Sequence, residues 1–560
     1  MLASLPRYAW VLIIAVASVA WFSVLDLRRL HHPDEGRYAE IAREMSVSGD
    51  WLTPRLNGIR YFEKPPLQYW VTAASFRAFE TDEWTARLAP AVAGFATIFV
   101  VGFAAAALAG PAAGVYAALA LAGCVWHIAL AHIVTLDALL SFLLACALAT
   151  FLLAQRDGLS RRALHAWMLA AWALIALAAL TKGLVALAIP AMALVAYSLL
   201  TRDWGPWRRL KPATGLAVFL AIAAPWFVMV AMANPGFADF FFVNEHIRRF
   251  ATEEAKRPGP WWYFVPLFAV GLLPWLSIAP WTWRDAWRAR AAPNGFRWQA
   301  FCLAWAGVVF AFFSVSQSKL PSYILPMFPA LMLALGPALE AMPSLRIARL
   351  MRPLAVTTTV LGVLVIAGFE SVAPRFADGR TPVETLVAYA PWAKTGAALL
   401  AAAAVAGWWW LRRGDERSRT LGIATVALGS LVAFQVLIVG LDTFRETRSG
   451  YDILREAQNA PGAPFDRRAP FYQVGSYDQT LPFYLGRTTT LVAYRDEFAT
   501  GLDMEPDLAI PTMAQWIDLW KARSDVYALI PLADYRQLEA QRLPMRVLAR
   551  GPRRVLVSRN

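Results

Sequence analysis

Long apolar runs constrain the fold of this chain more than any other feature. Of its 560 residues, 58% are hydrophobic and only 16% are charged, which is more apolar surface than a water-soluble protein of this size could bury. About 20 apolar residues span the hydrocarbon core of a bilayer as a helix. We therefore predict an α-helical polytopic membrane protein. Its transmembrane helices number about thirteen, near 8–26, 88–109, 112–127, 133–154, 166–181, 183–200, 213–233, 262–281, 299–315, 323–341, 353–371, 389–411 and 420–440.

The distribution of basic residues predicts how these helices are oriented. With a cytoplasmic N-terminus, the arginine-rich loops around 202–211, 284–297 and 412–419 lie inside. The short outer loops then hold few basic residues, namely Lys182, Lys319, Arg375 and Arg380. Because basic loops stay on the cytoplasmic side, this alternation places the C-terminus outside. The net charge of +14 is explained by these loops, so we expect a membrane and no nucleic acid as partner.

Segments on the outer side are too long to be simple turns. In residues 27–87, the stretches YAEIAREM and QYWVTAASFRAFE predict short helices lying along the membrane surface. Residues 441–560 alternate β-rich pieces such as TTTLVAY and DVYALIPL with helical pieces such as MAQWIDLWKAR. We therefore expect a transmembrane domain over 1–440, which includes the first outer loop, and a small α/β domain over 441–560.

Polar clusters from distant parts of the sequence all fall on the predicted outer side. They are HHPDEGRYAE at 31–40, YFEKPPLQY at 61–69, HIVTLDALL at 132–140, FFVNEHIRRF at 241–250 and SQSKLPSYILP at 316–326. Ionisable groups near bilayer depth are costly and usually serve function. Their distribution predicts one cavity on this side.

Two kinds of charged side chain occur in these clusters. The cations suit a phosphate group, although contact with bulk lipid phosphates is an alternative for any one of them: Lys64, Arg248, Arg249 and Lys319. The carboxylates suit a general base, a divalent metal or the hydroxyls of a sugar: Asp34, Glu35, Glu63, Asp137 and Glu245. The mixture indicates an anionic lipid headgroup that carries a polar cargo.

Three stretches of the chain closely resemble a known superfamily. They are HHPDEGRYAEIAREM after the first span, YFEKPPLQYW, and SKLPSYILPMFPAL at the start of a later span. They resemble the C superfamily of integral-membrane glycosyltransferases, which take sugars from polyprenyl phosphate carriers. Within it the chain is most similar to the bacterial lipid A aminoarabinose transferases, which have thirteen spans, an outer C-terminal domain and a segment like VNEHIRRF at 243–250. The protein O-mannosyltransferases share the Asp-Glu pair but tend to carry extra modules, for which this chain has no room.

This resemblance implies an activity and a location. The expected reaction moves 4-amino-4-deoxy-L-arabinose from undecaprenyl phosphate to a lipid A phosphate on the periplasmic side of the bacterial inner membrane. The expected enzyme is a monomer that confers resistance to polymyxin and cationic peptides. Transfer of another sugar to a protein or envelope glycan remains an alternative. A flippase is disfavoured because the sequence shows no paired repeats with broken spans, and a non-catalytic receptor would have no use for these acids and cations.

The resemblance also implies roles for individual residues. The catalytic carboxylate is Asp34, with Glu35 beside it. Asp137, within two turns of the start of a span, faces either the site, as a further catalytic candidate, or a partner on another helix. Asp34 could orient the acceptor, bind the sugar amine or stabilise positive charge at the anomeric carbon, and the alternative is that it only caps a helix beginning near Gly36. The residues expected to bind the carrier phosphate are Lys64, Arg249, Arg37, Lys319 and Tyr323. No cofactor is required, although His246 and Glu63 could hold a divalent metal.

Overall fold

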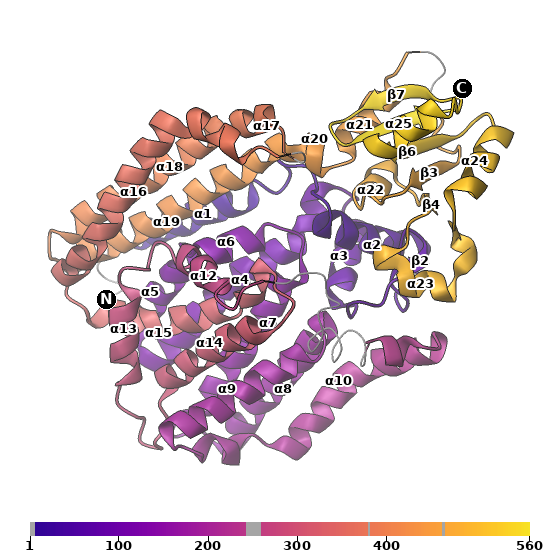
Figure 1. Cartoon of the computed structure of the whole chain (residues 1–560). Coiled ribbons are helices and arrows are strands. Elements are labelled where there is room, and N and C mark those ends of the chain that lie inside the picture. Colours follow the sequence, from indigo (N-terminus) through magenta and orange to yellow (C-terminus); the bar gives the residue numbers. More distant parts are fainter. Residues whose placement is uncertain (1–5, 242–258, 379–380, 462–464, 560) are drawn as a thin grey trace. The chain divides into compact units, whose positions relative to one another are not determined.

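The computed structural model describes residues 6–241, 259–378, 381–461 and 465–559 (Figure 1). The chain packs as two compact units, and each is discontinuous in sequence. The first, here called the helical unit, comprises Met1–Val24, Ala89–Phe369 and Pro391–Ile438. The second, the mixed unit, comprises Leu25–Leu88, Glu370–Ala390 and Val439–Asn560. Packing thus joins most of the first loop to the carboxy-terminal residues, whereas the sequence-based division at residue 440 follows the end of the last apolar run.

Each of the predicted apolar runs contains helix. The helices are α1 (Arg7–Phe22), α4 (Glu83–Ala109), α5 (Pro111–Ala122), α6 (Val125–Ala131), α7 (Leu136–Ala154), α8 (Arg161–Lys182), α9 (Val185–Thr201), α10 (Pro212–Ala233), α12 (Phe264–Gly271), α13 (Ala279–Trp287), α14 (Trp298–Val315), α15 (Met327–Ala341), α16 (Ser344–Val372), α18 (Ala390–Leu411) and α19 (Glu416–Gly440). The fold class is therefore the predicted one.

The predicted number of thirteen spans is not confirmed. In the described part of the chain, eight helices are long and apolar enough to cross a membrane, or nine if α5 and α6, bent by 62°, form one span. Helices α1 and α9 have 16 and 17 residues. At 1.5 Å per residue they are about 24 to 26 Å long, less than the hydrocarbon thickness of about 30 Å. The apolar run at 262–281 is divided between α12 and α13.

Small residues bring the helices of the helical unit close together. A Cβ atom on Gly336 of α15 would lie 2.5 Å from the carbonyl oxygen of Ala113 on α5. Likewise, a Cβ on Gly429 of α19 would collide with the side chain of Ala403 on α18. Close approach at glycine and alanine is how helices associate in lipid, where apolar surface alone gives no preference for a neighbouring helix.

The first loop contributes two helices and a hairpin to the mixed unit. Helices α2 (Asp34–Ser48) and α3 (Leu67–Ala78) pack against each other, and β1 (Arg55–Leu56) pairs antiparallel with β2 (Ile59–Arg60). The turn between the strands is Asn57-Gly58, with φ of 54° and 80°. An Asn-Gly pair tolerates positive φ at both positions, so it is the preferred two-residue hairpin turn.

The carboxy-terminal residues form an α/β domain, as predicted (Figure 1). Its six-stranded sheet has the order β5-β4-β3-β6-β8-β7. The strands β5, β4, β3 and β6 are parallel to one another, and β8 pairs antiparallel with both β6 and β7. The strands are β3 (Phe471–Val474), β4 (Thr490–Val492), β5 (Ala509–Ile510), β6 (Tyr527–Pro531), β7 (Arg546–Arg550) and β8 (Arg554–Ser558). The helices are α20 (Arg445–Arg448), α21 (Tyr451–Gln458), α22 (Leu481–Leu485), α23 (Ala499–Met504), α24 (Met513–Ala522) and α25 (Leu532–Ala540), and α17 (Val383–Ala388) precedes the domain in the chain.

Alternation along the strands gives this sheet a hydrophobic core on each face. Ala528 and Ile530 of β6 join one core with Trp516 and Trp520 of α24. Leu529, which lies between them in sequence, joins the other core with residues of α21. Because successive strand side chains point to opposite faces, both faces of the sheet are covered.

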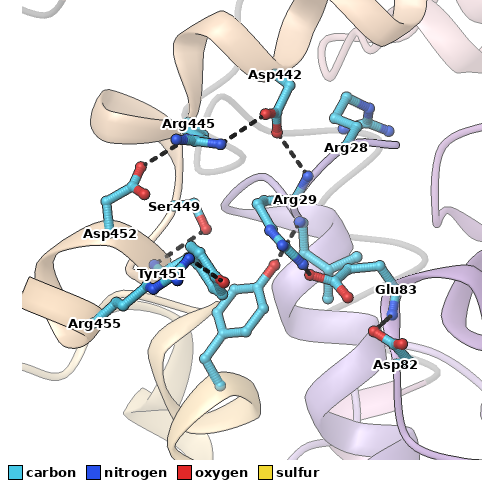
Figure 2. Close-up of polar contacts among 12 residues, drawn as sticks. Arg28, Arg29, Asp82, Glu83, Asp442, Arg445, Ser449, Tyr451, Asp452 and Arg455 are labelled. Carbon is cyan, nitrogen blue, oxygen red and sulfur yellow. Dashed lines mark hydrogen bonds and ion pairs between the residues drawn. The ribbon is translucent and has the colours of Figure 1, made fainter. Parts of the chain in front are cut away.

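Polar contacts tie the first loop to the carboxy-terminal residues within the mixed unit. The backbone N–H of Arg29 donates to Asp442 Oδ1 at 2.8 Å, and its guanidinium donates to Glu83 Oε1 at 2.7 Å (Figure 2). The same guanidinium lies 4.1 Å from the ring centroid of Tyr451. Elsewhere, Asn57 Nδ2 donates to the carbonyl oxygen of Thr489 at 2.7 Å. The loop is therefore held by the end of the chain.

Candidate functional site

The two acids of HHPDEGRYAE lie at the start of α2. Pro33 occupies the N-cap position, and Asp34 and Glu35 are the first two helical residues. Negative charge in a first turn interacts favourably with the helix dipole. Asp34 Oδ1 accepts a hydrogen bond from the Arg37 guanidinium at 2.7 Å, and Asp34 lies one position past the N-cap, so its side chain does not cap the helix. Its side chain is 31% exposed, which leaves the carboxylate accessible.

Glu35 has a different environment from its neighbour. Its side chain is 3% exposed, and its two oxygens accept from Arg28 at 2.5 and 2.9 Å. Arg87 Nε donates to Oε1 at 3.0 Å, and the backbone N–H of His31 donates to Oε2 at 3.1 Å. Burial would raise the pKa of Glu35, but the two arginines hold it well below its usual range. Glu35 is an ionised carboxylate whose oxygens both hold the loop together.

Arg37 lies between two carboxylates. Its Nε donates to Glu497 Oε2 at 2.6 Å, and NH1 donates to Asp34. Glu497 also accepts from Gln479 Nε2 at 2.6 Å. Arg37 is only 7% exposed, and so its charge is balanced inside the protein. The sequence-based role for Arg37, binding of the carrier phosphate, therefore competes with two ion pairs.

Two buried tyrosines lie among these charges. Burial, followed by the negative charge of Asp34, raises the pKa of Tyr38 well above its usual value. Burial, followed by the charge of Glu63, does the same for the pKa of Tyr61. Both phenols are thus neutral near pH 7 and can donate hydrogen bonds. The structure brings the predicted site residue Glu63 into the electrostatic neighbourhood of Tyr38 and Tyr61.

Lys64 lies in the mixed unit just before α3. Its ammonium donates to the carbonyl oxygen of Glu63 at 2.7 Å, and its side chain is half-buried. Pro65 and Pro66 follow and restrict the backbone before the helix begins at Leu67. The lysine is therefore held on a short, stiff segment.

The helical unit brings together a second set of predicted residues. Asp137, in the first turn of α7, forms an ion pair with Lys182 at the end of α8. The Lys182 ammonium lies 4.4 Å from the ring centroid of Tyr323. Lys319 donates to the carbonyl oxygen of Ser316 at 2.5 Å and is 6% exposed. Asp137 and Tyr323 are thus linked through Lys182.

Lys182 was not among the predicted site residues, although the sequence carried a signal for it. It lies at Thr181-Lys182-Gly183, the short break between two apolar runs. Gly183 has φ of 81°, a conformation that favours glycine and ends the helix. A lone lysine between two spans is costly unless it has a partner, and Asp137 is that partner.

The metal prediction is untested. His246 and Arg249 lie outside the described residues, so the structure does not test whether His246 and Glu63 share a metal ion. In the described part of the chain, Asp26, Asp82 and Glu83 have carboxylate oxygens close enough to share an ion. Glu83 already accepts from Arg29 (Figure 2), and these acids alone do not make a metal site.

Comparisons with known proteins agree with this fold and loop. Residues 9–241 match the family model for dolichyl-phosphate-mannose-protein mannosyltransferase, and residues 462–559 match the aminoarabinose transferase C-terminal domain. The chain is similar to the crystal structure of ArnT from Cupriavidus metallidurans bound to undecaprenyl phosphate. That match has 38% identity, a TM-score of 0.92 and coverage of 99% of each chain.

Two curated relatives carry the same name, undecaprenyl phosphate-alpha-4-amino-4-deoxy-L-arabinose arabinosyl transferase. The relative from Aeromonas salmonicida is 33% identical over 66% of this chain and 69% of its own length. The relative from Edwardsiella ictaluri is 32% identical, and the match spans 57% of each protein.

The helical membrane fold and the Asp-Glu loop define a polyprenyl-phosphate-dependent glycosyltransferase of the integral-membrane class. Within that class, the chain belongs to the undecaprenyl phosphate-4-amino-4-deoxy-L-arabinose arabinosyl transferases.

Proposed function

We propose that this protein transfers 4-amino-4-deoxy-L-arabinose from undecaprenyl phosphate to a phosphate of lipid A at the periplasmic face of the bacterial inner membrane. The observation that carries the proposal is the match over 99% of the chain to an ArnT structure that contains undecaprenyl phosphate. Lipid A as acceptor rests on the resemblance of the first loop, VNEHIRRF and the later SKLPSYILP stretch to the lipid A-modifying transferases.

The proposed reaction is a direct displacement. A lipid A phosphate oxygen forms a bond to the anomeric carbon of the sugar, while the bond from that carbon to the carrier phosphate breaks. Undecaprenyl phosphate leaves with the bonding electrons. The attacking oxygen is already anionic, so the enzyme does not need a strong base. Asp34, the accessible carboxylate, instead stabilises the positive charge that develops at the anomeric carbon.

The cations are proposed to bind the carrier phosphate. Lys64 is the first candidate because it is half-buried on a segment stiffened by two prolines. Arg249 is the second candidate, on sequence grounds. Lys319 and Tyr323 keep their predicted role as contacts of the carrier phosphate, and Asp137 holds Lys182 beside Tyr323.

The direct test uses purified protein with synthetic undecaprenyl phosphate-aminoarabinose and lipid A. Mass spectrometry should detect lipid A carrying one added aminoarabinose. In Asp34→Asn, the side chain keeps its size but loses its charge, so transfer should fall by roughly 10²-fold or more. The matched control is Asp50→Asn, because Asp50 lies in the same loop and accepts from the backbone N–H groups of Leu52 and Thr53. Near-normal transfer by Asp34→Asn would refute the catalytic role.

Carrier binding is tested separately. Lys64→Ala should weaken the binding of an undecaprenyl phosphate headgroup by roughly 1.5–3 kcal/mol, the range for a hydrogen bond to a charged group. Lys521→Ala on α24 is the control. Unchanged affinity in folded Lys64→Ala would mean that this lysine contacts only bulk lipid.

Membrane orientation follows from the charge distribution of the loops. We propose a cytoplasmic N-terminus and a periplasmic mixed unit in a monomeric enzyme. A reporter that is active only after export should be active when fused after Asn560. A reporter signal from the cytoplasm would mean that the number of spans is even.

A further inference from the structure

Glu497 reaches the catalytic loop from the other end of the chain. It lies 460 positions after Arg37, yet its Oε2 accepts from Arg37 Nε at 2.6 Å. The side chains of Arg37 and Glu497 are 9% and 10% exposed. Gln479 in turn donates to Glu497 Oε1 at 2.6 Å. The chain of contacts from Gln479 through Glu497 and Arg37 to Asp34 is continuous, and it is mostly buried up to Asp34, whose side chain is 31% exposed.

The start of α2 packs directly on the same carboxy-terminal segment. A Cβ atom on Gly36 would lie 2.6 Å from the backbone carbon of Gln479 and 2.6 Å from Cγ2 of Thr480. Only glycine permits this approach. The helix turn that carries Asp34 is therefore fixed in two ways by residues 479–497, through backbone contact and through an ion pair.

We propose that Glu497, held by Gln479, is a positioning residue that fixes the catalytic carboxylate of Asp34 through Arg37. The proposal rests on the function proposed above, because Asp34 is the group positioned. Glu497 holds one edge of the guanidinium, which leaves NH1 directed at Asp34. An arginine fork restrained by two carboxylates loses its rotational freedom, so the Asp34 oxygens are held in one orientation relative to the sugar.

A second loop-to-tail ion pair provides the matched control. Arg55 of β1 contacts both carboxylate oxygens of Glu505 at 3.1 Å. This pair also joins the first loop to the carboxy-terminal residues, but none of the contacts described above connects it to Asp34. Loss of Glu505 should therefore affect stability without affecting catalysis.

The kinetic test measures kcat and KM for transfer from undecaprenyl phosphate-aminoarabinose. We expect Glu497→Gln to lower kcat by roughly 3- to 10-fold with KM for the carrier unchanged, and Glu505→Gln to leave kcat within 2-fold. In an Arg37→Gln background, adding Glu497→Gln should lower kcat no further, because the link is already broken. A normal kcat in Glu497→Gln, or equal losses in both glutamate variants, would overturn the proposal.

A milder variant covers the case in which Glu497→Gln does not fold. Gln479→Ala removes only the amide that holds Glu497. It should lower kcat about 2- to 3-fold, again with KM unchanged. An unchanged kcat in folded Gln479→Ala would overturn the proposal equally.

A substrate-free test separates this inference from the proposed function. Asp34 and Glu497 share the buried Arg37 guanidinium, so either acid alone still neutralises part of its charge. The double variant Asp34→Asn/Glu497→Gln should therefore lower the unfolding temperature by more than the sum of the two single variants. In Arg37→Gln, the effects of the two acid substitutions should be additive. Additive losses in the presence of Arg37 would overturn the inference. If the variants show this coupling but the wild-type protein transfers no aminoarabinose, the proposed function is refuted instead.

Discussion

In the helical unit, small residues let helices meet closely, as where Gly429 of α19 faces Ala403 of α18. In the mixed unit, buried charges join segments that are distant in sequence, as where Glu35 meets Arg28 and Arg87. The first arrangement depends on shape and the second on charge. The helical unit should therefore be sensitive to added volume, whereas the mixed unit, which carries Asp34, should be sensitive to the removal of a charge or to pH.

The largest expected effect breaks the charge network. Glu35→Gln keeps the side-chain volume but leaves two buried arginines without their counterion. Removing one partner of a buried ion pair costs roughly 3–5 kcal/mol, so the mixed unit should unfold at a markedly lower temperature. Thermal unfolding in detergent measures this loss. Glu446→Gln, at an exposed position on α20, should change little, and similar stability in both variants would contradict the comparison.

The next effect breaks the shape-based packing. Gly429→Leu forces α18 and α19 apart and should destabilise the helical unit by roughly 1–3 kcal/mol, the usual cost of overpacking. Gly368→Leu on α16 is the matched control, because a Cβ there meets no other atom within 4 Å. Thermal unfolding of the two variants in one detergent gives the comparison. Equal losses of stability in the two variants would mean that close helix packing at Gly429 is not what stabilises this unit.

A third effect concerns pH. Burial, followed by the nearby Arg28 charge, lowers the pKa of His31 to about 3. The unfolded chain protonates this histidine below about pH 6.5, whereas the folded protein does not. Stability should therefore fall as pH drops below 6.5, by up to about 1.4 kcal/mol per pH unit from this group.

His31→Gln provides the test of this pH dependence. Unfolding temperatures between pH 7.5 and 5.5 should fall less steeply in His31→Gln than in the wild type. Burial lowers the pKa of His32 as well, so part of the slope should remain. An unchanged slope would show that His31 is not buried in its neutral form.

The smallest expected effect comes from an exposed ion pair, which tests whether only buried charges stabilise the mixed unit. Arg495 and Asp503 form an ion pair whose side chains are 57% and 69% exposed. Exposed pairs contribute little because water screens them, so Arg495→Gln should cost less than about 1 kcal/mol. A loss as large as that of Glu35→Gln would mean that any charge in this unit matters, not only a buried one.

Local features of this fold could be predicted from the sequence, because they depend on neighbouring residues. The apolar runs indicated helices, and the β-rich stretches TTTLVAY and DVYALIPL indicated β4 and β6. The helix start near Asp34 was also visible, because Pro-Asp-Glu is typical of a first turn. The number of spans was harder to predict, since hydropathy does not distinguish a full span from a helix of 16 or 17 residues or from a bent pair of helices.

Partners of the site residues could not be predicted. Nothing near Arg37 in sequence indicates Glu497, and nothing near Glu35 distinguishes it from Asp34 as a buried carboxylate. Arg37 finds its partner through packing against the carboxy-terminal residues, and Glu35 finds its partners through the tertiary fold of the first loop, neither of which local periodicity encodes. The roles of Lys64 and of the metal candidates stay predictions, and the carrier-binding experiment above tests the role of Lys64.

The discontinuity of the mixed unit has a consequence for biosynthesis. The first loop, which ends at Leu88, leaves the ribosome roughly 350 residues before Val439, where the last segment of the mixed unit begins. At about 5–20 residues per second, this interval lasts on the order of 20 to 70 s. Throughout that time Arg37 and Gly36 lack the contacts from residues 479–497 that hold them in the finished protein. A nascent chain stalled before its last 120 or so residues would therefore carry Asp34, the proposed catalytic residue, without the contacts proposed to hold it in its working position.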